Sequence, residues 1–201
     1  MFIDKNGVVR MPKAYLAGTE IFYPDSDATQ EKYHAICEKY GIIGYYPPDI
    51  APEDEYKEYV KKDDSLHEME MQLFTHDLNH ILRTDIIIAN LNDYRGNEPD
   101  SGTAVECGIA WGRGHRCFAF IDDARPMKER FKGVKKINED GIVTDKDGAH
   151  LEDFDMPLNL MFCDFTIFEG DFETAVKGIR KIFNDELVAA GYEPFEVKDE
   201  E

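Results

Sequence analysis

Two carboxylates are the side chains of this chain best placed to do chemistry. Asp100 and Glu106 lie six residues apart, where a polar loop at 92–102 meets a short helix of small residues expected at 103–111. A branched apolar run at 85–91 precedes the loop and is typical of a buried parallel strand. In an open α/β sheet, ligands bind at the carboxyl ends of such strands. The loop contains neither GxxxxGK[ST] nor GxGxxG, so the two acids favour acid or nucleophile chemistry over phosphate binding.

Each of these acids also has a purely structural interpretation. In the first turn of its helix, Glu106 could be a capping acid, because the helix dipole favours a carboxylate there and lowers its pKa. The same field would keep the carboxylate ionised, as a nucleophile requires. Asp100 could equally be a turn or cap residue. The spacing alone leaves both interpretations open.

Three further residues could join the two acids. Tyr15, within a strand expected at 13–18, is by default a core aromatic. Asp77, on a helix expected at 65–82, is by default solvated, but it precedes the next strand by only eight residues. Eight residues of antiparallel helix rise roughly 12 Å and the strand climbs roughly 20 Å, so Asp77 can lie near the same edge. Asn159 stands in the otherwise apolar stretch PLNLM, where a buried amide requires partners.

The composition narrows the class of protein. The 201 residues carry a formal net charge of −19, from 42 acidic and 23 basic residues, which argues against nucleic-acid or anionic-membrane partners. The four cysteines lack CxxC spacing and are expected to be small buried residues of a reduced protein. The six histidines show no HxxxH or HExxH pairing, so we predict no metal and no cofactor. Without an apolar run of membrane-spanning length or a signal-peptide pattern, a cytoplasmic protein is expected.

Strands that alternate with helices predict an α/β fold. Five strands on a short chain favour a flavodoxin-like three-layer sandwich, with a mostly parallel sheet in the order 2-1-3-4-5 and its switch point between strands 1 and 3. The end of the strand that contains Tyr15 and the loop that contains Asp100 would then converge. The expected strands lie at 13–18, 42–46, 85–91, 116–121 and 165–168, with a final helix from Asp171.

A single domain over residues 1–201 is expected. It would include an N-terminal extension at 1–11 able to form a hairpin, a hairpin inserted within 122–151, and an acidic tail at 196–201. The acidic segment 49–64 is interpreted as a long loop or a partly helical lid. The residues of the 65–82 helix expected to face inward are Leu66, Met69, Leu73, Phe74 and Ile81.

The sequence resembles the nucleoside 2-deoxyribosyltransferase family. The similar stretches are AYLAGTEIFYPD, HDLNHILRTDIIIANL, YRGNEPDSGTAVECGIAWG and MPLNLM, which together span most of the chain in the order of the family. The combination of [DE]-x-G-[ST]-A-x-E-x-G with a downstream P-x-N-L-M is specific. The RGxEPDxGTA form is similar to protist-type members, whereas segment 49–64, the inserted hairpin and the acidic tail differ from the short bacterial members.

The resemblance implies a catalytic role for the two acids and the tyrosine. Glu106 would be the nucleophile that attacks the anomeric carbon of a 2'-deoxynucleoside, and Tyr15 would hydrogen-bond to it and orient it. Asp100 and Asp77 would hold the nucleobase and relay its proton. Expulsion of a nucleobase through an oxocarbenium-like state is the N-glycosidic analogue of retaining glycosidase chemistry. The resemblance also implies two substrate-binding residues, Gly18 and Phe22, the latter stacking on or walling the base.

The PLNLM stretch suggests an interface between subunits. By resemblance, Asn159 and Met161 would reach the sugar end of a neighbouring subunit's site, in a hexamer built as a trimer of dimers. On a monomer, this stretch would expose Leu158, Leu160 and Met161 as an apolar patch, which usually marks an interface. The expected partners are therefore deoxynucleosides, free nucleobases and further copies of this chain.

Two other functions remain open at this point. A 2'-deoxynucleoside 5'-monophosphate N-hydrolase would need Ser, Arg or bare amides near the 5' end of the sugar, where this chain has PLNLM without a cation. A flavodoxin-like module could instead bind a nucleoside without any chemistry. Neither the accepted bases nor the strictness for the 2'-deoxy sugar follows from the sequence.

Overall fold

The computed structural model describes residues 1–49 and 65–197 and has a five-stranded parallel sheet at its centre. The strand order β4-β3-β5-β6-β9 corresponds to 2-1-3-4-5 among the core strands, which confirms the predicted flavodoxin-like topology. All four pairings are parallel, as expected for branched apolar strands covered on both faces. The core strands are β3 (Lys13–Ala17), β4 (Ile43–Tyr45), β5 (Ile86–Asn90), β6 (Arg116–Ile121) and β9 (Thr166–Glu169).

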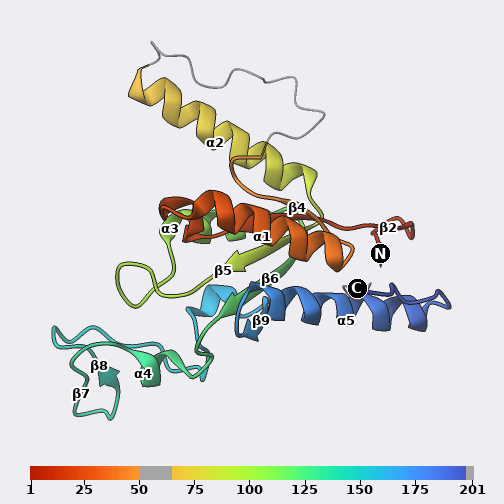
Figure 1. Ribbon diagram of the computed structural model, residues 1–201. Coiled ribbons are helices and arrows are strands. Elements are labelled where there is room, and N and C mark those ends of the chain that lie inside the picture. Colours follow the sequence, from red (N-terminus) through yellow and green to blue (C-terminus); the bar gives the residue numbers. More distant parts are fainter. Residues whose placement is uncertain (50–64, 198–201) are drawn as a thin grey trace.

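Four long helices form the two outer layers (Figure 1). The helices α1 (Ser26–Lys39) and α5 (Phe172–Ala189) share one hydrophobic cluster with one face of the sheet. The helices α2 (Leu66–Arg83) and α3 (Ser101–Gly112) contribute to a second cluster on the opposite face. The structure therefore has three layers, with one hydrophobic core on each face of the central sheet.

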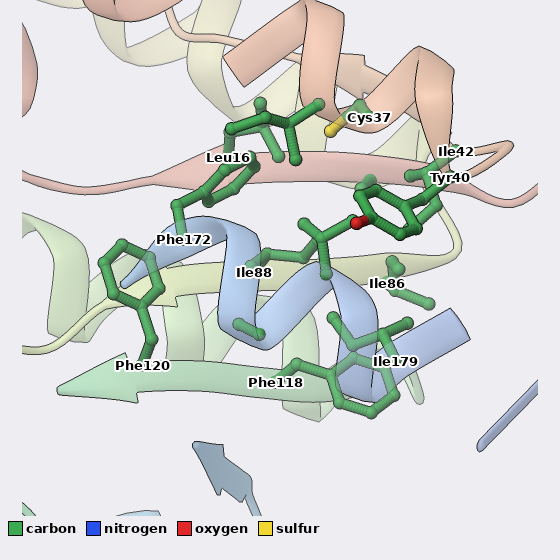
Figure 2. Close-up of a cluster of buried hydrophobic side chains, with 14 of the residues drawn as sticks. Leu16, Cys37, Tyr40, Ile42, Ile86, Ile88, Phe118, Phe120, Phe172 and Ile179 are labelled. Carbon is green, nitrogen blue, oxygen red and sulfur yellow. The ribbon is translucent and has the colours of Figure 1, made fainter. Parts of the chain in front are cut away.

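Side chains alternate between the two cores along each strand. Leu16 and Ile88, paired in the register of β3 and β5, face α1 and α5, where Figure 2 shows them close to Phe172. Their neighbours Tyr15 and Ile87, also paired, face α2 and α3. The two-residue period of the strand therefore directs Tyr15 toward the layer that carries Asp77 and Glu106.

The first half of α2 departs from the predicted pattern. Leu66, Leu73 and Phe74 are exposed by 79%, 55% and 51%, so the prediction that they face inward is wrong for the isolated chain. Ile81 is buried as predicted, and Met69 is half-buried. Figure 1 shows the reason: the N-terminal half of α2 extends beyond the sheet, and only its last turns pack on the body. An apolar stripe predicts a contact surface but cannot say which surface covers it.

Two hairpins lie outside the central sheet. The strands β1 (Phe2–Ile3) and β2 (Val9–Arg10) form the predicted N-terminal hairpin, and Phe2 belongs to the core beside α5. The inserted hairpin is confirmed as β7 (Lys136–Ile137) and β8 (Val143–Thr144), which projects from the sheet together with α4 (Met127–Arg130) (Figure 1). The predicted lid falls almost wholly on residues 50–64, and most of the acidic tail on 198–201, both outside the described residues.

The insertion is fastened to the sheet edge by Arg130. Its Nε and Nη2 atoms donate to the carbonyl oxygen of Pro157 at 2.9 and 2.5 Å, and its Nη1 atom donates to Asp93 in the loop after β5. Both ends of the insertion therefore lie at the carboxyl edge of the sheet. No helix among the described residues is long and apolar enough to cross a membrane.

Two predictions about single side chains are wrong. Leu158 was expected on the surface but is 1% exposed, because it packs into the core between the sheet and α3. Cys163 was expected in the interior but is exposed, whereas the other three cysteines are buried. The short 3-10 helix η2 (Leu160–Phe162) explains the first result, since it turns Leu158 inward and leaves Met161 75% exposed.

Candidate active site

Asp100 begins the helix that carries the second acid. Its side chain accepts hydrogen bonds from the backbone N–H of Thr103 at 3.0 Å and from the Thr103 hydroxyl at 3.2 Å, which makes it the N-cap of α3. Because α3 starts at Ser101, Glu106 lies in the second turn and not in the first. The interpretation of Glu106 as a capping acid is therefore wrong, whereas Asp100 is indeed a cap residue.

A part-buried hydrogen bond joins β3 to α3. The hydroxyl of Tyr15, a residue with no exposed surface, donates to Oε1 of Glu106 at 2.6 Å. The Tyr15 ring also meets the edge of the His80 ring on α2, with the centroids 6.5 Å apart. Burial and the nearby charge of Glu106 raise the pKa of Tyr15 well above its usual range, so its hydroxyl remains a donor.

The carboxyl group of Glu106 ionises with difficulty. Burial raises its pKa to about 7, and the charges of Asp77 and Asp100 act in the same direction, while the hydrogen bond from Tyr15 opposes them. The expectation that the helix dipole lowers this pKa is wrong, because the residue lies beyond the first turn and its carboxyl group loses solvation through burial. Near neutral pH, Glu106 is therefore present in both its protonated and its ionised form.

Asp77 faces the same cavity as Glu106. The cavity lies between α2 and α3 and has a volume of about 360 Å³. Burial raises the pKa of Asp77 to about 6, with His76 acting in the opposite direction. Asp77 therefore lies near the same edge of the sheet as Glu106, as the estimate from helix and strand lengths allowed. The other lining residues are Phe74, Leu78, Ile81, Ser101, Gly102, Val105 and Ile109.

The two predicted substrate-binding residues near strand β3 occupy its carboxyl end. Gly18 follows the strand and precedes the 3-10 helix η1 (Thr19–Phe22). Phe22 is 58% exposed and stacks on the ring of Tyr94. Among the described residues, neither Gly18 nor Phe22 lines the cavity shared by Asp77 and Glu106.

One chain does not bring the PLNLM residues to Glu106. Asn159 and Met161 line a second cavity of about 360 Å³, formed with Trp111 of α3 and Phe162 of η2. The Asn159 amide donates to Glu152 at 2.7 Å, and its oxygen accepts from the backbone N–H of Met161 at 3.0 Å. The predicted partners of this half-buried amide therefore exist, but they lie on the other side of α3 from the nucleophile candidate.

Several polar residues near the site were not predicted from the sequence. Glu20, Asn90 and Tyr94 lie at the carboxyl ends of β3 and β5, and His80 packs on Tyr15. A signal existed for Asn90, because it is a polar residue at the end of a buried apolar strand. Over residues 1–49 and 65–197, no group of three or more His, Cys, Asp or Glu side chains is placed to hold a metal ion.

Fold and site together define an α/β protein with a tyrosine-bonded carboxylate at the switch point of a parallel sheet. Residues 14–161 match the family model of nucleoside 2-deoxyribosyltransferases, so the chain belongs to that family. Membership indicates a nucleoside deoxyribosyltransferase-type enzyme with nucleoside and nucleobase substrates. No curated protein matches the chain at a significant level.

Three solved structures match the chain. The 2-desoxiribosyltransferase from Leishmania mexicana is 26% identical with a TM-score of 0.62, over 84% of this chain and 96% of that one. The 2-deoxyribosyltransferase from Bacillus psychrosaccharolyticus is 19% identical with a TM-score of 0.48, over 92% and 99%. The CMP N-glycosidase BcmB from Clostridium botulinum is 17% identical with a TM-score of 0.35, over 54% and 71%.

The raised pKa of Glu106 predicts a pH-dependent cost to folding. A rise from the ordinary value of 4.5 to about 7 corresponds to about 3 kcal/mol. The folded state prefers the protonated carboxyl, so the free energy of unfolding falls as pH rises from 4.5 to 7. Glu106→Gln keeps an acceptor for Tyr15 without the charge. We expect it to be more stable than wild type at pH 8 by up to that amount, and nearly equal at pH 5. Urea denaturation at one fixed protein concentration measures the free energy of unfolding of the variant and the wild type at each pH. A variant that is less stable than wild type at pH 8 contradicts the prediction.

Proposed function

We propose that the protein transfers a 2-deoxyribosyl group between nucleobases through a covalent intermediate on Glu106. The observation that carries the proposal is the part-buried hydrogen bond from the Tyr15 hydroxyl to Glu106, 2.6 Å long, beside a cavity that Asp77 also lines. The arrangement leaves one carboxylate oxygen for the anomeric carbon and fixes the other. Membership of the deoxyribosyltransferase family supports the choice of substrates.

In the first half-reaction, a carboxylate oxygen of Glu106 forms a bond to C1' of a 2'-deoxynucleoside. The N-glycosidic bond breaks, its electron pair stays with the departing base, and that base takes up a proton from an acid of the site. A nitrogen of the second base then attacks C1' and releases Glu106, and the proton of the new base returns to the same acid. One cavity can serve both half-reactions because the sugar stays attached between them.

Asp77 suits the proton transfer better than Asp100 does. Burial raises the pKa of Asp77 to about 6, so it can both hold and release a proton near neutral pH. Asp100 is already engaged as the cap of α3 through Thr103. We assign the proton relay to Asp77, and to Asp100 the fixing of the loop and a contact with the base.

Glu106→Ala should abolish transfer, because binding alone cannot replace a nucleophile. We expect a loss of several orders of magnitude in deoxyadenosine formed from deoxyinosine and adenine. In the wild type, intact-mass spectrometry after quenching with deoxyinosine should detect a deoxyribosyl adduct on Glu106. Parallel assays with deoxyinosine 5'-monophosphate separate the alternatives: a hydrolase would need the phosphate, and a binding module would give no product. Near-normal turnover of Glu106→Ala, or an adduct elsewhere, would refute the assignment.

Transfer should rise with pH as Glu106 ionises around pH 7. The negative charge of Asp77 raises the pKa of Glu106 more than that of Asp100 does, so Asp77→Asn should move the acid limb of the pH–rate profile to lower pH. Its maximal rate should also fall, because the amide cannot relay a proton. Asp100→Asn, which keeps the cap, serves as the matched control with a smaller displacement of the limb. An acid limb that stays in place or moves upward in Asp77→Asn speaks against this coupling.

The surface of α2, α3 and η2 supports a shared site between subunits. Phe74, Val105, Trp111 and Met161 are exposed by 51%, 59%, 54% and 75% and border the two cavities on either side of α3. Apolar exposure on this scale usually marks an interface. A two-fold neighbour on this face would cover it and present its own Asn159 to the sugar at Glu106. A hexamer of three such dimers is the assembly we propose.

Subunit mixing tests the shared site. Glu106→Ala and Asn159→Ala oligomers should each be nearly inactive. After subunit exchange, a mixed dimer contains one site with an intact Glu106 from one chain and an intact Asn159 from the other, so activity should partly return. Mixing either variant with the Glu106→Ala/Asn159→Ala double variant is the matched control and should restore nothing. Absence of recovery after demonstrated exchange, or full activity in a monomer, would exclude the shared site.

A further inference from the structure

A histidine of α2 packs on the tyrosine that bonds to Glu106. His80 is 1% exposed, and its ring meets the ring of Tyr15 nearly at a right angle, with centroids 6.5 Å apart and planes inclined by 83°. The ring of Tyr45 meets the same imidazole at 5.6 Å and 71°. Because Tyr15 and Tyr45 are paired in the register of β3 and β4, one imidazole ring packs on two neighbouring strands. In a close-packed interior, His80 therefore limits the positions open to the Tyr15 ring.

The imidazole of His80 is itself held in place. The ring of His76, one turn earlier on α2, packs on it with the centroids 4.3 Å apart. Nε2 of His76 donates a hydrogen bond to the carbonyl oxygen of Pro47 at 2.8 Å, since a carbonyl oxygen can only accept. Pro47 lies just after the end of β4. The two histidines therefore join the last turns of α2 to β4 as well as to β3.

The histidines lie beside the residues of α2 that face the site. Asp77 and Ile81 line the cavity next to Glu106. Each of them directly follows one of the histidines, so α2 presents two adjacent stripes of side chains. One stripe faces the cavity, and the other packs on β3 and β4. The same turns of the helix therefore supply an acid to the site and a packing surface to Tyr15.

The hydrogen bond next to this packing surface is directional. The Tyr15 hydroxyl donates to Oε1 of Glu106 at 2.6 Å, and such a bond weakens steeply as its angle bends. A ring that tilted would stay buried and still lose the bond. The bond favours the ionised carboxylate and lowers the pKa of Glu106, against the charges of Asp77 and Asp100. The ionisation of Glu106 therefore depends on the orientation of the Tyr15 ring.

We propose that His80 is a positioning residue, which holds the ring of Tyr15 so that its hydroxyl donates to Glu106. The contacts run without interruption from Pro47 through His76 and His80 to Tyr15. This role rests on the proposed function for its catalytic meaning alone, since the ring contacts and the hydrogen bond belong to the fold. Loss of the imidazole should therefore act on Glu106 through Tyr15 and by no other route.

A titration followed by NMR tests this role without turnover. In protein labelled with carbon-13 at the glutamate carboxyl groups, the signal that Glu106→Gln lacks identifies Glu106 and gives its pKa. His80→Ala should raise that pKa by roughly one pH unit, the effect of weakening one hydrogen bond to a carboxylate. His80→Phe, which restores a flat ring, should bring the pKa back toward that of the wild type. His67→Ala is the matched control, because His67 is an exposed histidine of the same helix, and it should leave the pKa of Glu106 unchanged.

A double-mutant cycle tests the route through the tyrosine. Tyr15→Phe removes the donor and should raise the pKa of Glu106 at least as far as His80→Ala does. In the Tyr15→Phe background, His80→Ala should have no further effect, because the bond that it disturbs is already absent. An equal rise in both backgrounds, or a rise that His80→Phe fails to reverse, would mean that His80 acts by charge or by general packing, and would overturn the positioning role. If His80→Ala does not fold, His80→Leu, which fills most of the space without a flat ring, takes its place in the cycle with the same expectations.

Kinetics separate this role from the proposed function. If Glu106 carries the sugar, the acid limb of the pH–rate profile should move to higher pH in His80→Ala together with the pKa. KM for deoxyinosine should change less than about twofold, because the described residues that line the cavity do not include His80. A wild type without transfer activity, combined with the expected pKa cycle, would refute the proposed function and leave the positioning role intact. An unchanged or lowered pKa of Glu106 in His80→Ala would overturn the positioning role, whatever the activity.

Discussion

A hydrogen bond between a tyrosine of the core and a half-buried carboxylate is the constraint on which this molecule depends. Tyr15 must lie on the inner face of a central strand, and Glu106 must approach it from a helix that starts more than eighty residues later. A helix can come this near the sheet only with small side chains on its buried face, and Cys107 and Ala110 meet that need. The fold therefore has less hydrophobic volume here and contains a poorly solvated carboxylate with a raised pKa.

The fold was predictable because local patterns determine it. Apolar runs, each closed by glycine, proline or polar residues, located all five core strands. Their alternation with helices implied the parallel order that the structure confirms. Because that order places the ends of the first and third core strands side by side, it also predicted that Tyr15 and the loop of Asp100 converge. The pKa of Glu106 was predicted in the wrong direction, because the sequence does not show how far the carboxyl group is buried. In addition, α3 starts two residues earlier than expected, so the side chain lies beyond the first turn.

Other features were beyond the sequence for physical reasons. Whether the apolar side of α2 is buried depends on what packs against it. An apolar stripe on a helix looks the same in the sequence whether its own sheet or another molecule covers it. Glu20 and Asn90 are separated by seventy residues and become partners only through the pairing of β3 with β5. Leu158 and Met161 carry similar apolar side chains, yet Leu158, just before the 3-10 helix η2, lies inward and Met161, within it, is exposed. No periodicity encodes such a turn.

The attachment of the inserted hairpin has an evolutionary consequence. Arg130 binds Pro157, where the chain returns from the insertion, and Asp93 in a neighbouring loop. The hairpin between Arg130 and Pro157 therefore starts and ends at the same edge of the sheet. Once its ends are held, each doubling of such a segment costs only about 0.6 kcal/mol in loop entropy. Insertions and deletions can therefore accumulate here while the residues from 157 onward keep their place. The position is a natural point of divergence between lineages, and a graft point for a foreign peptide or a second domain.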